Sequence, residues 1–405
     1  MVHFDRRTVN ASSFATARAM VVRKDNWRIA LEEALHAVLS GRDTGPDLLV
    51  LFASTAYSHD YPELVREAFH GSGAGCLVGC SARGVIANDD SHEIEPGIAM
   101  LALWLPGADL RPIRLHQEMN EVLADPDLWY SVNRLHPDDV RGWLVFAEPF
   151  RMDVQESVTH LRSRYPGTPM IGALTSSHRH DRQMWVFLDD HVYDEGGVAL
   201  ALMGPYNLDV IVSQGGEPVG EPWTITGVDK NRITTISNRP ALEVMRETMR
   251  KVGWTSEKDA PVLIGFPMNE YQDDFKRGDF VVRGLLGIEE STGSLIVGSI
   301  PRVGQTVQFH LREPRSAEVD QRRLLGDMQH RLRKDDLIAG LLCTCKGRGT
   351  AMFGHENHDA SLVHSAFPEL PVAGLFSFGE IGPVRGVPAL NGFAMSFGVI
   401  SRRPA

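Results

Sequence analysis

A glycine-rich turn near the carboxyl terminus has the residue types that bind an anion. It runs from Cys345 to Gly349 (Cys-Lys-Gly-Arg-Gly) and follows an apolar stretch, residues 337–343, that predicts a buried strand. Ligands of α/β sheets bind at the carboxyl ends of strands; here Gly347 leaves backbone N–H groups accessible, and Lys346 and Arg348 add positive charge. The turn therefore predicts a site for a carboxylate or a phosphate. The alternative is an ordinary loop with solvated basic residues.

A single acidic residue follows the next predicted strand. Glu380 lies between two glycines, just after residues 371–376. Packing does not require a carboxylate there, so we expect Glu380 to bind an amine or a guanidinium of a ligand, or to pair with an arginine of the chain. Arg283 and Arg312 are the candidate arginines, because each lies in an apolar, strand-like context where a guanidinium needs a carboxylate or an anionic ligand.

The cysteines and histidines predict no metal centre. The four cysteines, at positions 76, 80, 343 and 345, do not have the spacing of common zinc sites. His355 and His358 are one residue too close for a zincin helix. We expect the cysteines to pack in the core, with Cys345 as the exception. A thiolate–imidazole pair of Cys345 and His358 would make the protein an enzyme, which is an alternative hypothesis.

Three copies of a strand–helix–strand pattern position these residues. They span residues 48–80, 142–174 and 337–376, and each has the length of a βαβ unit. The second and third copies share a junction of an aromatic residue, proline, two free positions, proline, two small or apolar residues and glycine, and in the first copy only Gly79 aligns. A glycine near the strand end permits close approach, either by a ligand or by the chain itself. The sequence does not choose between the two.

The segments between these copies predict antiparallel strands. They are short alternating or apolar runs at residues 97–105, 183–188, 197–203 and 209–213. A turn-rich segment then precedes a predicted helix that begins near Pro240. We therefore predict an α/β fold of mixed α+β character, in which repeated βαβ units carry added antiparallel strands and form two domains.

Composition and charge exclude several classes of partner. The chain has 405 residues, and 41 basic against 52 acidic side chains give a net charge of −11. Nucleic acid and anionic membranes are therefore disfavoured as partners. No apolar run approaches the ~18 residues of a membrane helix, and no secretory signal is visible. Four cysteines are too few for a disulfide scaffold, so we expect a cytoplasmic protein.

Several segments together resemble the FIST family (F-box and intracellular signal transduction) over residues 28 to 400. They are Gly79–Ser81, Ser213–Pro222, Asn238–Leu242, Arg283–Gly287, Gly304–Arg312, Cys345–Gly349, Asn357–Asp359 and Gly379–Pro383. The resemblance implies an N-terminal extension at 1–27, a FIST N-terminal domain at 28–237 and a FIST C-terminal domain at 238–400. It also implies departures from the family pattern, since Gly216 stands where many relatives have cysteine and Asn391 where histidine is common.

The resemblance further implies a ligand-sensing protein of signal transduction, with amino acids or similar small zwitterions as ligands, no cofactor, and a separate signalling protein as a partner. The site residues that it implies, together with those singled out above, are Cys345, Gly347, Arg348, Gly349, His358, Asp359, Glu380, Arg283, Arg312 and Ser81. In this hypothesis Arg348 meets a ligand carboxylate, and Glu380 or Asp359 meets an amino group. The runner-up is a haem-binding nitric-oxide sensor, with His358, His310 or His178 as the iron ligand.

Overall fold

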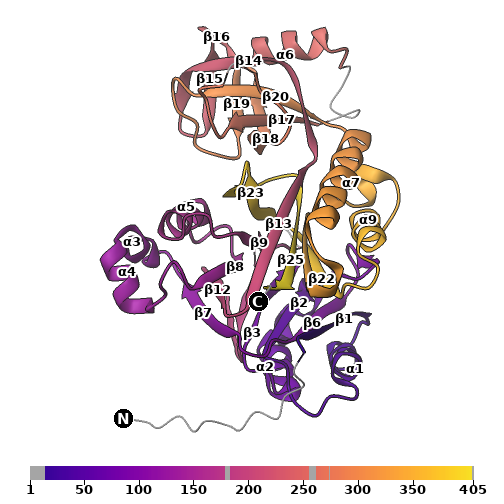
Figure 1. Ribbon diagram of the computed structural model, residues 1–405. Coiled ribbons are helices and arrows are strands. Elements are labelled where there is room, and N and C mark those ends of the chain that lie inside the picture. Colours follow the sequence, from indigo (N-terminus) through magenta and orange to yellow (C-terminus); the bar gives the residue numbers. More distant parts are fainter. Residues whose placement is uncertain (1–13, 178–182, 255–260, 273, 404–405) are drawn as a thin grey trace.

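The body of the protein consists of three sheets with the same internal plan. The computed structural model describes residues 14–177, 183–254, 261–272 and 274–403, and within these residues each of the three sheets has six strands. In every sheet the two strands of a βαβ unit pair in parallel, and the remaining pairs are antiparallel. The predicted α/β class, the repeated βαβ units and the added antiparallel strands are thus confirmed (Figure 1).

The strand order shows the repetition directly. The first sheet runs β1 (Thr16–Arg23), β6 (Gly97–Trp104), β2 (Leu48–Ser54), β3 (Leu77–Ala82), β10 (Val186–Leu188), β11 (His191–Tyr193). The second runs β7 (Asp109–Leu115), β12 (Gly197–Met203), β8 (Val140–Ala147), β9 (Met170–Leu174), β23 (Gly379–Val384), β24 (Val387–Asn391). The third runs β13 (Tyr206–Gln214), β25 (Ala394–Arg402), β21 (Leu337–Cys345), β22 (Val372–Ser377), β4 (Gly84–Ala87), β5 (Asp90–His92).

Each repeat contributes a hairpin to the sheet of another repeat. The hairpin β4–β5 follows β3 in the chain but pairs with β22, β10–β11 follows β9 but pairs with β3, and β23–β24 follows β22 but pairs with β9. The exchange is cyclic, so every sheet is completed by a segment of another repeat. Ser176, just after β9, donates hydrogen bonds to the carbonyl oxygens of Ser81 on β3 and Phe376 on β22, so the carboxyl ends of these three strands meet.

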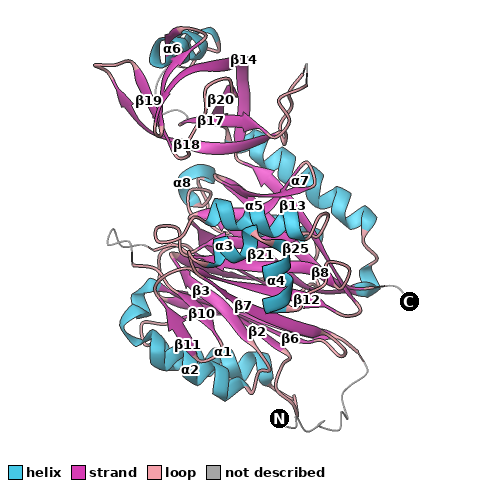
Figure 2. Ribbon diagram, turned by 90° about the vertical axis from the view of Figure 1, so that its left-hand side faces the viewer, coloured by secondary structure: helices cyan, strands magenta, loops and turns pink. Residues whose placement is uncertain are grey.

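Helices cover the outer faces of the sheets, and the inner faces share one core (Figure 2). The first sheet carries α1 (Trp27–Leu39), the 3-10 helix η1 (Thr55–Asp60) and α2 (Tyr61–Ser72), and the second carries α3 (Met119–Ala124), α4 (Pro126–Asn133) and α5 (Val154–Arg164). The third carries α7 (Pro314–Arg331) and α9 (His358–Ala366), while η2 (Lys334–Asp336) and α8 (Thr350–Phe353) lie in the connections on either side of β21. In the shared core Phe52 of the first sheet meets Phe146 of the second edge to face, with ring centroids 5.3 Å apart, and Cys343 of the third belongs to the same cluster.

A glycine at the same place in each βαβ unit is required by the chain. A Cβ atom on Gly79, Gly172 or Gly374 would lie 1.8, 1.8 and 2.0 Å from a backbone carbonyl oxygen of the adjacent parallel strand. These contacts are far below van der Waals distance. Of the two alternatives that the sequence left open, the structure therefore supports close approach by the neighbouring strand.

A smaller β-rich module is inserted between β13 and α7. It contains β14 (Gly216–Asp229), β15 (Arg232–Ile236), β16 (Arg239–Pro240), β17 (Val262–Pro267), β18 (Phe280–Glu289), β19 (Ser294–Val297) and β20 (Thr306–Arg312), with α6 (Ala241–Lys251) packed against its core. The order is β14-β20-β17-β18-β19-β15-β16, and β14 also pairs with β15, so the sheet curls back on itself. The module begins after β13, which belongs to the third sheet, and ends with β20. The predicted boundary at 237/238 therefore lies inside the module, between β15 and β16. Figures 1 and 2 show the module above the body.

Candidate functional site

Arg348 and Asp359 form a buried ion pair behind the glycine-rich turn. The turn after β21 carries Arg348, and the first turn of α9 carries Asp359. Arg348 Nε and Nη2 donate to the two Asp359 oxygens at 2.8 and 3.0 Å, and Nη2 also donates to Gln321 Oε1 at 3.1 Å. Thr344 Oγ1 donates to the same carboxylate. Burial opposes ionisation of Asp359, but the Arg348 charge and these hydrogen bonds hold its pKa well below the usual value.

His358 completes this cluster and leaves little room beside it. Its Nδ1 lies 3.0 Å from Asp359 Oδ1, and its ring stacks on Phe353 with centroids 3.4 Å apart. The adjoining cavity, lined by Thr344, Arg348, His358 and Asp359 among others, has a volume of about 10 Å³, enough for about one water molecule. The structure therefore brings three predicted site residues together as an internal ion-pair cluster, in which Arg348 Nη1 and His358 Nε2 have no hydrogen-bond partner among the described residues. The expectation that Arg348 meets a ligand carboxylate and Asp359 an amino group differs from this arrangement, because the two side chains neutralise each other.

A carboxylate of the chain binds directly after the turn, at the first residue of α8. Glu93 accepts hydrogen bonds from the N–H and the hydroxyl of Thr350, at 2.6 and 2.7 Å. A Cβ atom on Gly349 would lie 2.2 Å from the Glu93 carboxylate, so glycine is needed for this approach. Glu93 lies 257 residues away in sequence. A carboxylate of the chain thus binds at the first residue of α8, and the ligand site predicted for the turn itself stays a prediction.

Glu380 and Cys345 are buried beside this cluster. Glu380 Oε1 accepts a hydrogen bond from Ser377 Oγ at 2.5 Å, and Oε2 accepts one from the Ala394 N–H at 3.0 Å. Burial outweighs these bonds and raises the pKa of Glu380 to about 8. Burial likewise raises the pKa of Cys345 to about 12, so its thiol is protonated at neutral pH and is a poor nucleophile.

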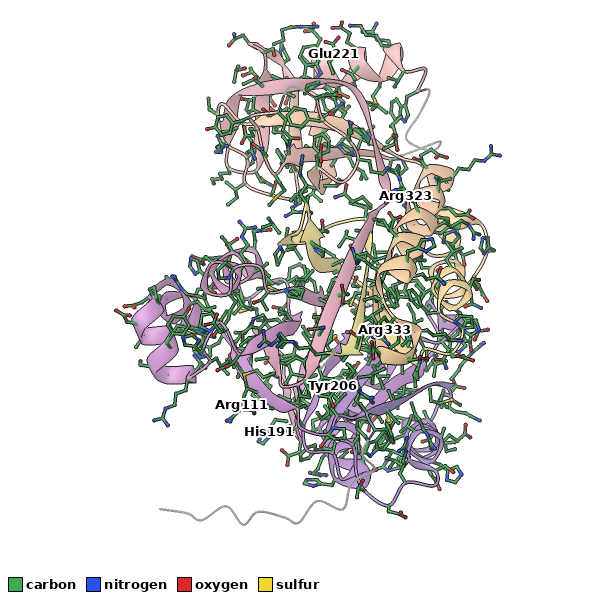
Figure 3. All side chains as sticks on the ribbon, viewed as in Figure 1. Arg111, His191, Tyr206, Glu221, Arg323 and Arg333 are labelled. Atoms are coloured by element: carbon green, nitrogen blue, oxygen red, sulfur yellow. The ribbon has the colours of Figure 1, made fainter. Side chains whose placement is uncertain are left out.

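Arg283 is held differently from Arg348. Its Nη1 donates to the carbonyl oxygens of Leu390 and Val282 at 2.8 and 3.1 Å, and its Nη2 donates to Gln155 Oε1 at 2.9 Å. Within the described ranges no carboxylate lies within 4.0 Å of its guanidinium. Burial lowers the pKa of Arg283 to about 10, and the Glu380 charge partly opposes this shift. By contrast, Arg323 and Arg333 project from the surface near α7 and pair there with aspartates (Figure 3).

Arg283 lines a cleft between the module and the body. The cleft has a volume of about 540 Å³, within the usual range of small-molecule sites. Its charged lining residues are Asp153 and Arg162 on the body and Arg283 on the module, and its apolar lining includes Phe266 and Ile300. A second cavity of about 440 Å³ shares Asp153, Gln155 and Leu390 with it and extends over the carboxyl end of β8. The cleft thus places two cations and one carboxylate around an open space.

Of the remaining predicted residues, Arg312 and Gly347 lie near Cys345 and Arg348, whereas Ser81 belongs to another sheet. Arg312 lies at the end of β20, and its Nη2 and the Nη1 of Arg348 are buried atoms without a hydrogen-bond partner among the described residues. Gly347 is close to Arg312, since a Cβ atom there would lie 3.5 Å from its Nη2. Ser81 is part of the first sheet, and its hydroxyl accepts the Trp185 N–H at 3.0 Å. Sequence reasoning missed Asp153, Gln155 and Arg162, because only the fold brings the start of α5 against the module.

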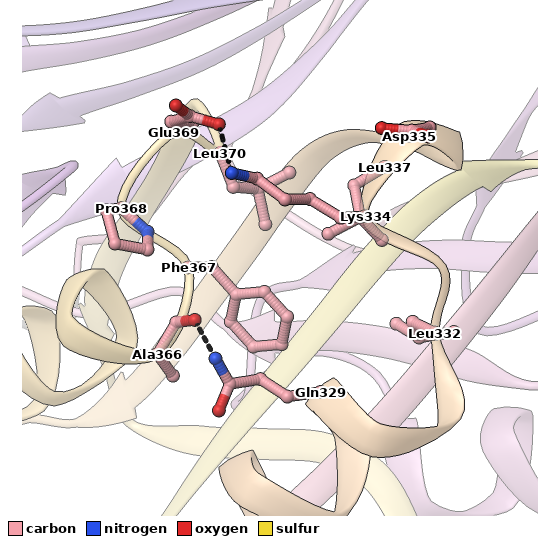
Figure 4. A pocket seen from close by; sticks show the side chains of 10 residues that line it. All are labelled: Gln329, Leu332, Lys334, Asp335, Leu337, Ala366, Phe367, Pro368, Glu369 and Leu370. Atoms are coloured by element: carbon pink, nitrogen blue, oxygen red, sulfur yellow. Dashed lines mark hydrogen bonds and ion pairs between the residues drawn. The ribbon is translucent and has the colours of Figure 1, made fainter.

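A third cavity, of about 410 Å³, lies at the outer end of α7 (Figure 4). Phe367 and Leu370 line it, and Lys334 pairs across its rim with Glu369 at 2.8 Å. None of the predicted site residues lines this cavity. Of its three charged lining residues, Lys334 and Glu369 pair with each other and Asp335 is the third, so its one cation already has a carboxylate partner, unlike Arg283 in the cleft.

The histidines proposed as haem ligands do not fit that group in this arrangement. His358 is stacked, hydrogen-bonded and next to a cavity of only about 10 Å³. His310 is fully buried, with its ring 4.7 Å from that of Phe280, and burial lowers its pKa to about 4. His178 lies outside the described residues. Among the residues that the structure covers, no three His, Cys, Asp or Glu side chains group as metal ligands.

None of the helices in the described part of the chain is long and apolar enough to cross a lipid bilayer. The four cysteines are all free thiols and all buried. Both observations concern the described residues, and neither identifies a partner.

Comparison with known proteins gives a family but no characterised relative. An uncharacterized protein of Mycobacterium tuberculosis (strain H37Rv) is 32% identical over 377 residues, covering 92% of this chain and 96% of the relative. An uncharacterized protein of Mycobacterium bovis is 31% identical over 376 residues, covering 91% and 95%. A solved structure of a cyanuric acid hydrolase aligns over 96% of this chain and 99% of its own, with 8% identity and a TM-score of 0.34, too low to support any inference. The model of the FIST N domain matches residues 47–239, and that of the FIST C domain matches residues 241–383. The chain therefore belongs to the FIST family, whose domains are associated with signal transduction and small-ligand sensing.

Proposed function

We propose that this protein is a cytoplasmic sensor that binds a small zwitterion, such as an amino acid, in the cleft between the module and the body. The observation that carries the proposal is the charge of Arg283, which faces a cleft of about 540 Å³ and has no carboxylate partner among the described residues. A partly desolvated guanidinium held only by neutral acceptors is an incomplete ion pair. A ligand carboxylate completes it, in the geometry that arginine favours.

Asp153 supplies the opposite charge. Its Oδ1 accepts the Glu156 N–H at 2.9 Å as the N-cap of α5, and this contact leaves the other carboxylate oxygen for an ammonium group. A zwitterion between Arg283 and Asp153 has both ends paired, which offsets the cost of removing it from water. Arg162 adds a second cation for a ligand with a second acidic group.

Ligand binding at this place gives a route to signalling. A ligand held by Asp153 of the body and Arg283 of the module favours the orientation of the module relative to the body that brings these two side chains together. The binding energy is thereby coupled to the position of the module. We propose that a separate signalling protein detects that position.

The test is a thermal-shift screen of the twenty common amino acids against the full chain. We expect at least one to stabilise the wild type, by about 2.7 kcal/mol at 100 times its dissociation constant. Arg283→Met removes the charge and Asp153→Asn removes the carboxylate but keeps an N-cap residue, so both should lose the stabilisation. Arg246→Met, which removes an exposed arginine of the same module, is the matched control. Failure of every amino acid to stabilise the wild type, or equal stabilisation of Arg283→Met, would contradict the proposal.

A further inference from the structure

A second pair of cations lies at the centre where the three repeats meet. Gly84 on β4 pairs with Phe376 on β22, and Cys345 on β21 pairs with Ser377 on the other side of β22. Arg83 directly precedes β4, and Lys346 directly follows β21. Their Cα atoms are thus separated by two strand spacings, about 10 Å. Long side chains from these two positions can meet over the end of β22.

Hydrogen bonds fix both backbone positions. The Arg83 N–H donates to Ser176 Oγ at 2.7 Å, and Ser176 Oγ in turn donates to the Phe376 carbonyl oxygen. The Lys346 N–H donates to the Ser377 carbonyl oxygen at 2.8 Å. Residues of all three repeats therefore hold these two cations at the carboxyl end of β22, which is where α/β sheets bind ligands.

The two charges lack acidic partners. Lys346 Nζ lies 4.5 Å from the centroid of the Phe378 ring, and neither Lys346 nor Arg83 has a carboxylate within 4.0 Å in the described part of the chain. Both side chains are only partly exposed. Burial, and then the charge of Arg83, lowers the pKa of Lys346. Two like charges at this separation repel each other. An anion between them would relieve this repulsion.

An unsatisfied hydroxyl belongs to the same region. Thr175 is fully buried, and its Oγ1 has no hydrogen-bond partner among the described residues. It directly follows Leu174, whose carbonyl oxygen accepts the Phe378 N–H at 3.2 Å. Thr175 also directly precedes Ser176, whose hydroxyl accepts the Arg83 N–H, so it lies between two residues that contact the backbones of Phe378 and Arg83. Its hydroxyl is a buried donor without a partner among the described residues of that segment.

We infer that Arg83, Lys346 and the Thr175 hydroxyl form a binding site for a phosphate group, either free or on a small phosphomonoester. Two cations suit a dianion better than a single carboxylate. Arginine can hold two phosphate oxygens while lysine acts as a point charge on a third. This site is separate from the cleft at Arg283, and the two ligands are of different chemical classes. The inference does not depend on the proposed function.

Calorimetric titration of the full chain with inorganic phosphate and with glycerol 3-phosphate tests the inference. Saturable binding of either supports it, and the tighter of the two identifies the source of the phosphate group. Lys346→Met and Arg83→Met should each weaken binding about tenfold or more, whereas Lys346→Arg keeps the charge and should retain most of the affinity. Lys334→Met, which removes an exposed lysine that is paired with Glu369, is the control and should bind as the wild type does.

A second measurement does not depend on the variants folding. An amine-specific reagent modifies exposed lysines of the wild type, and peptide mass spectrometry gives the rate at each position. Phosphate should slow modification of Lys346 but not of Lys334, when compared with chloride at equal ionic strength. Absence of saturable binding of both probes, or unchanged affinity in both methionine variants, would overturn the inference, as would equal modification of Lys346 with and without phosphate.

Discussion

Arg348 and Arg283 are two arginines with the same chemistry and opposite surroundings. Arg348 is 1% exposed and makes two hydrogen bonds to Asp359, so the chain itself provides its counter-ion. Arg283 donates to two carbonyl oxygens and one amide, and it faces the cleft. In the first case the chain itself neutralises the arginine. In the second case we propose that a ligand supplies the missing anion. What distinguishes them is the presence of a carboxylate in the chain.

The largest effect is expected from breaking the complete pair. Asp359→Asn leaves a fully buried guanidinium without its counter-ion and should reduce the free energy of unfolding by about 3–5 kcal/mol. Denaturant unfolding measures this loss. Arg246→Met is the control, because Arg246 forms an exposed ion pair with Glu290, and such pairs contribute at most about 1 kcal/mol. A loss below about 1 kcal/mol in Asp359→Asn would mean that the pair is not a stabilising element.

A pH-dependent effect is expected from Glu380. Its pKa is raised to about 8 in the folded protein, against about 4.3 in an unfolded chain, so between these values the folded state binds a proton that the unfolded state lacks. Stability from this group is therefore complete below pH ~4 and is lost as the pH rises toward 8, by at most about 1.4 kcal/mol per pH unit.

The matched variant for this prediction is Glu380→Gln, which resembles the protonated acid at every pH. The free energy of unfolding of the wild type, measured from pH 5 to 8, should fall relative to that of Glu380→Gln. Parallel profiles of the two proteins would show that Glu380 keeps an ordinary pKa.

The smallest effect on stability is expected from Arg283→Met. The substitution removes a charge that has no carboxylate to leave unpaired, so the free energy of unfolding should change by less than about 1 kcal/mol or increase. Denaturant unfolding in the absence of ligand measures it, beside Asp359→Asn in the same buffer. If Arg283→Met reduces the free energy of unfolding as much as Asp359→Asn does, Arg283 has a counter-ion within the chain.

The sequence predicted the local elements well and the long-range partners poorly. Each βαβ unit spans no more than about forty consecutive residues, so its elements can be predicted from a local pattern. Arg348 and Asp359 are likewise only 11 positions apart in the sequence. The exchanged hairpins, the contact of Glu93 with Thr350 across 257 residues, and that of Arg283 with Gln155 across 128 residues carry no local pattern. A buried arginine in an apolar strand looks the same in the sequence whether its anion is a distant side chain or a ligand.

The central claim is that the charge of Arg283 is reserved for a small carboxylate. Isothermal titration of the wild type and of Arg283→Met, with the amino acid that stabilises the wild type most, tests it most directly. We predict at least a tenfold loss of affinity in the variant, with an unfolding transition that stays cooperative. Equal affinity in the two proteins would contradict the claim and place the ligand elsewhere.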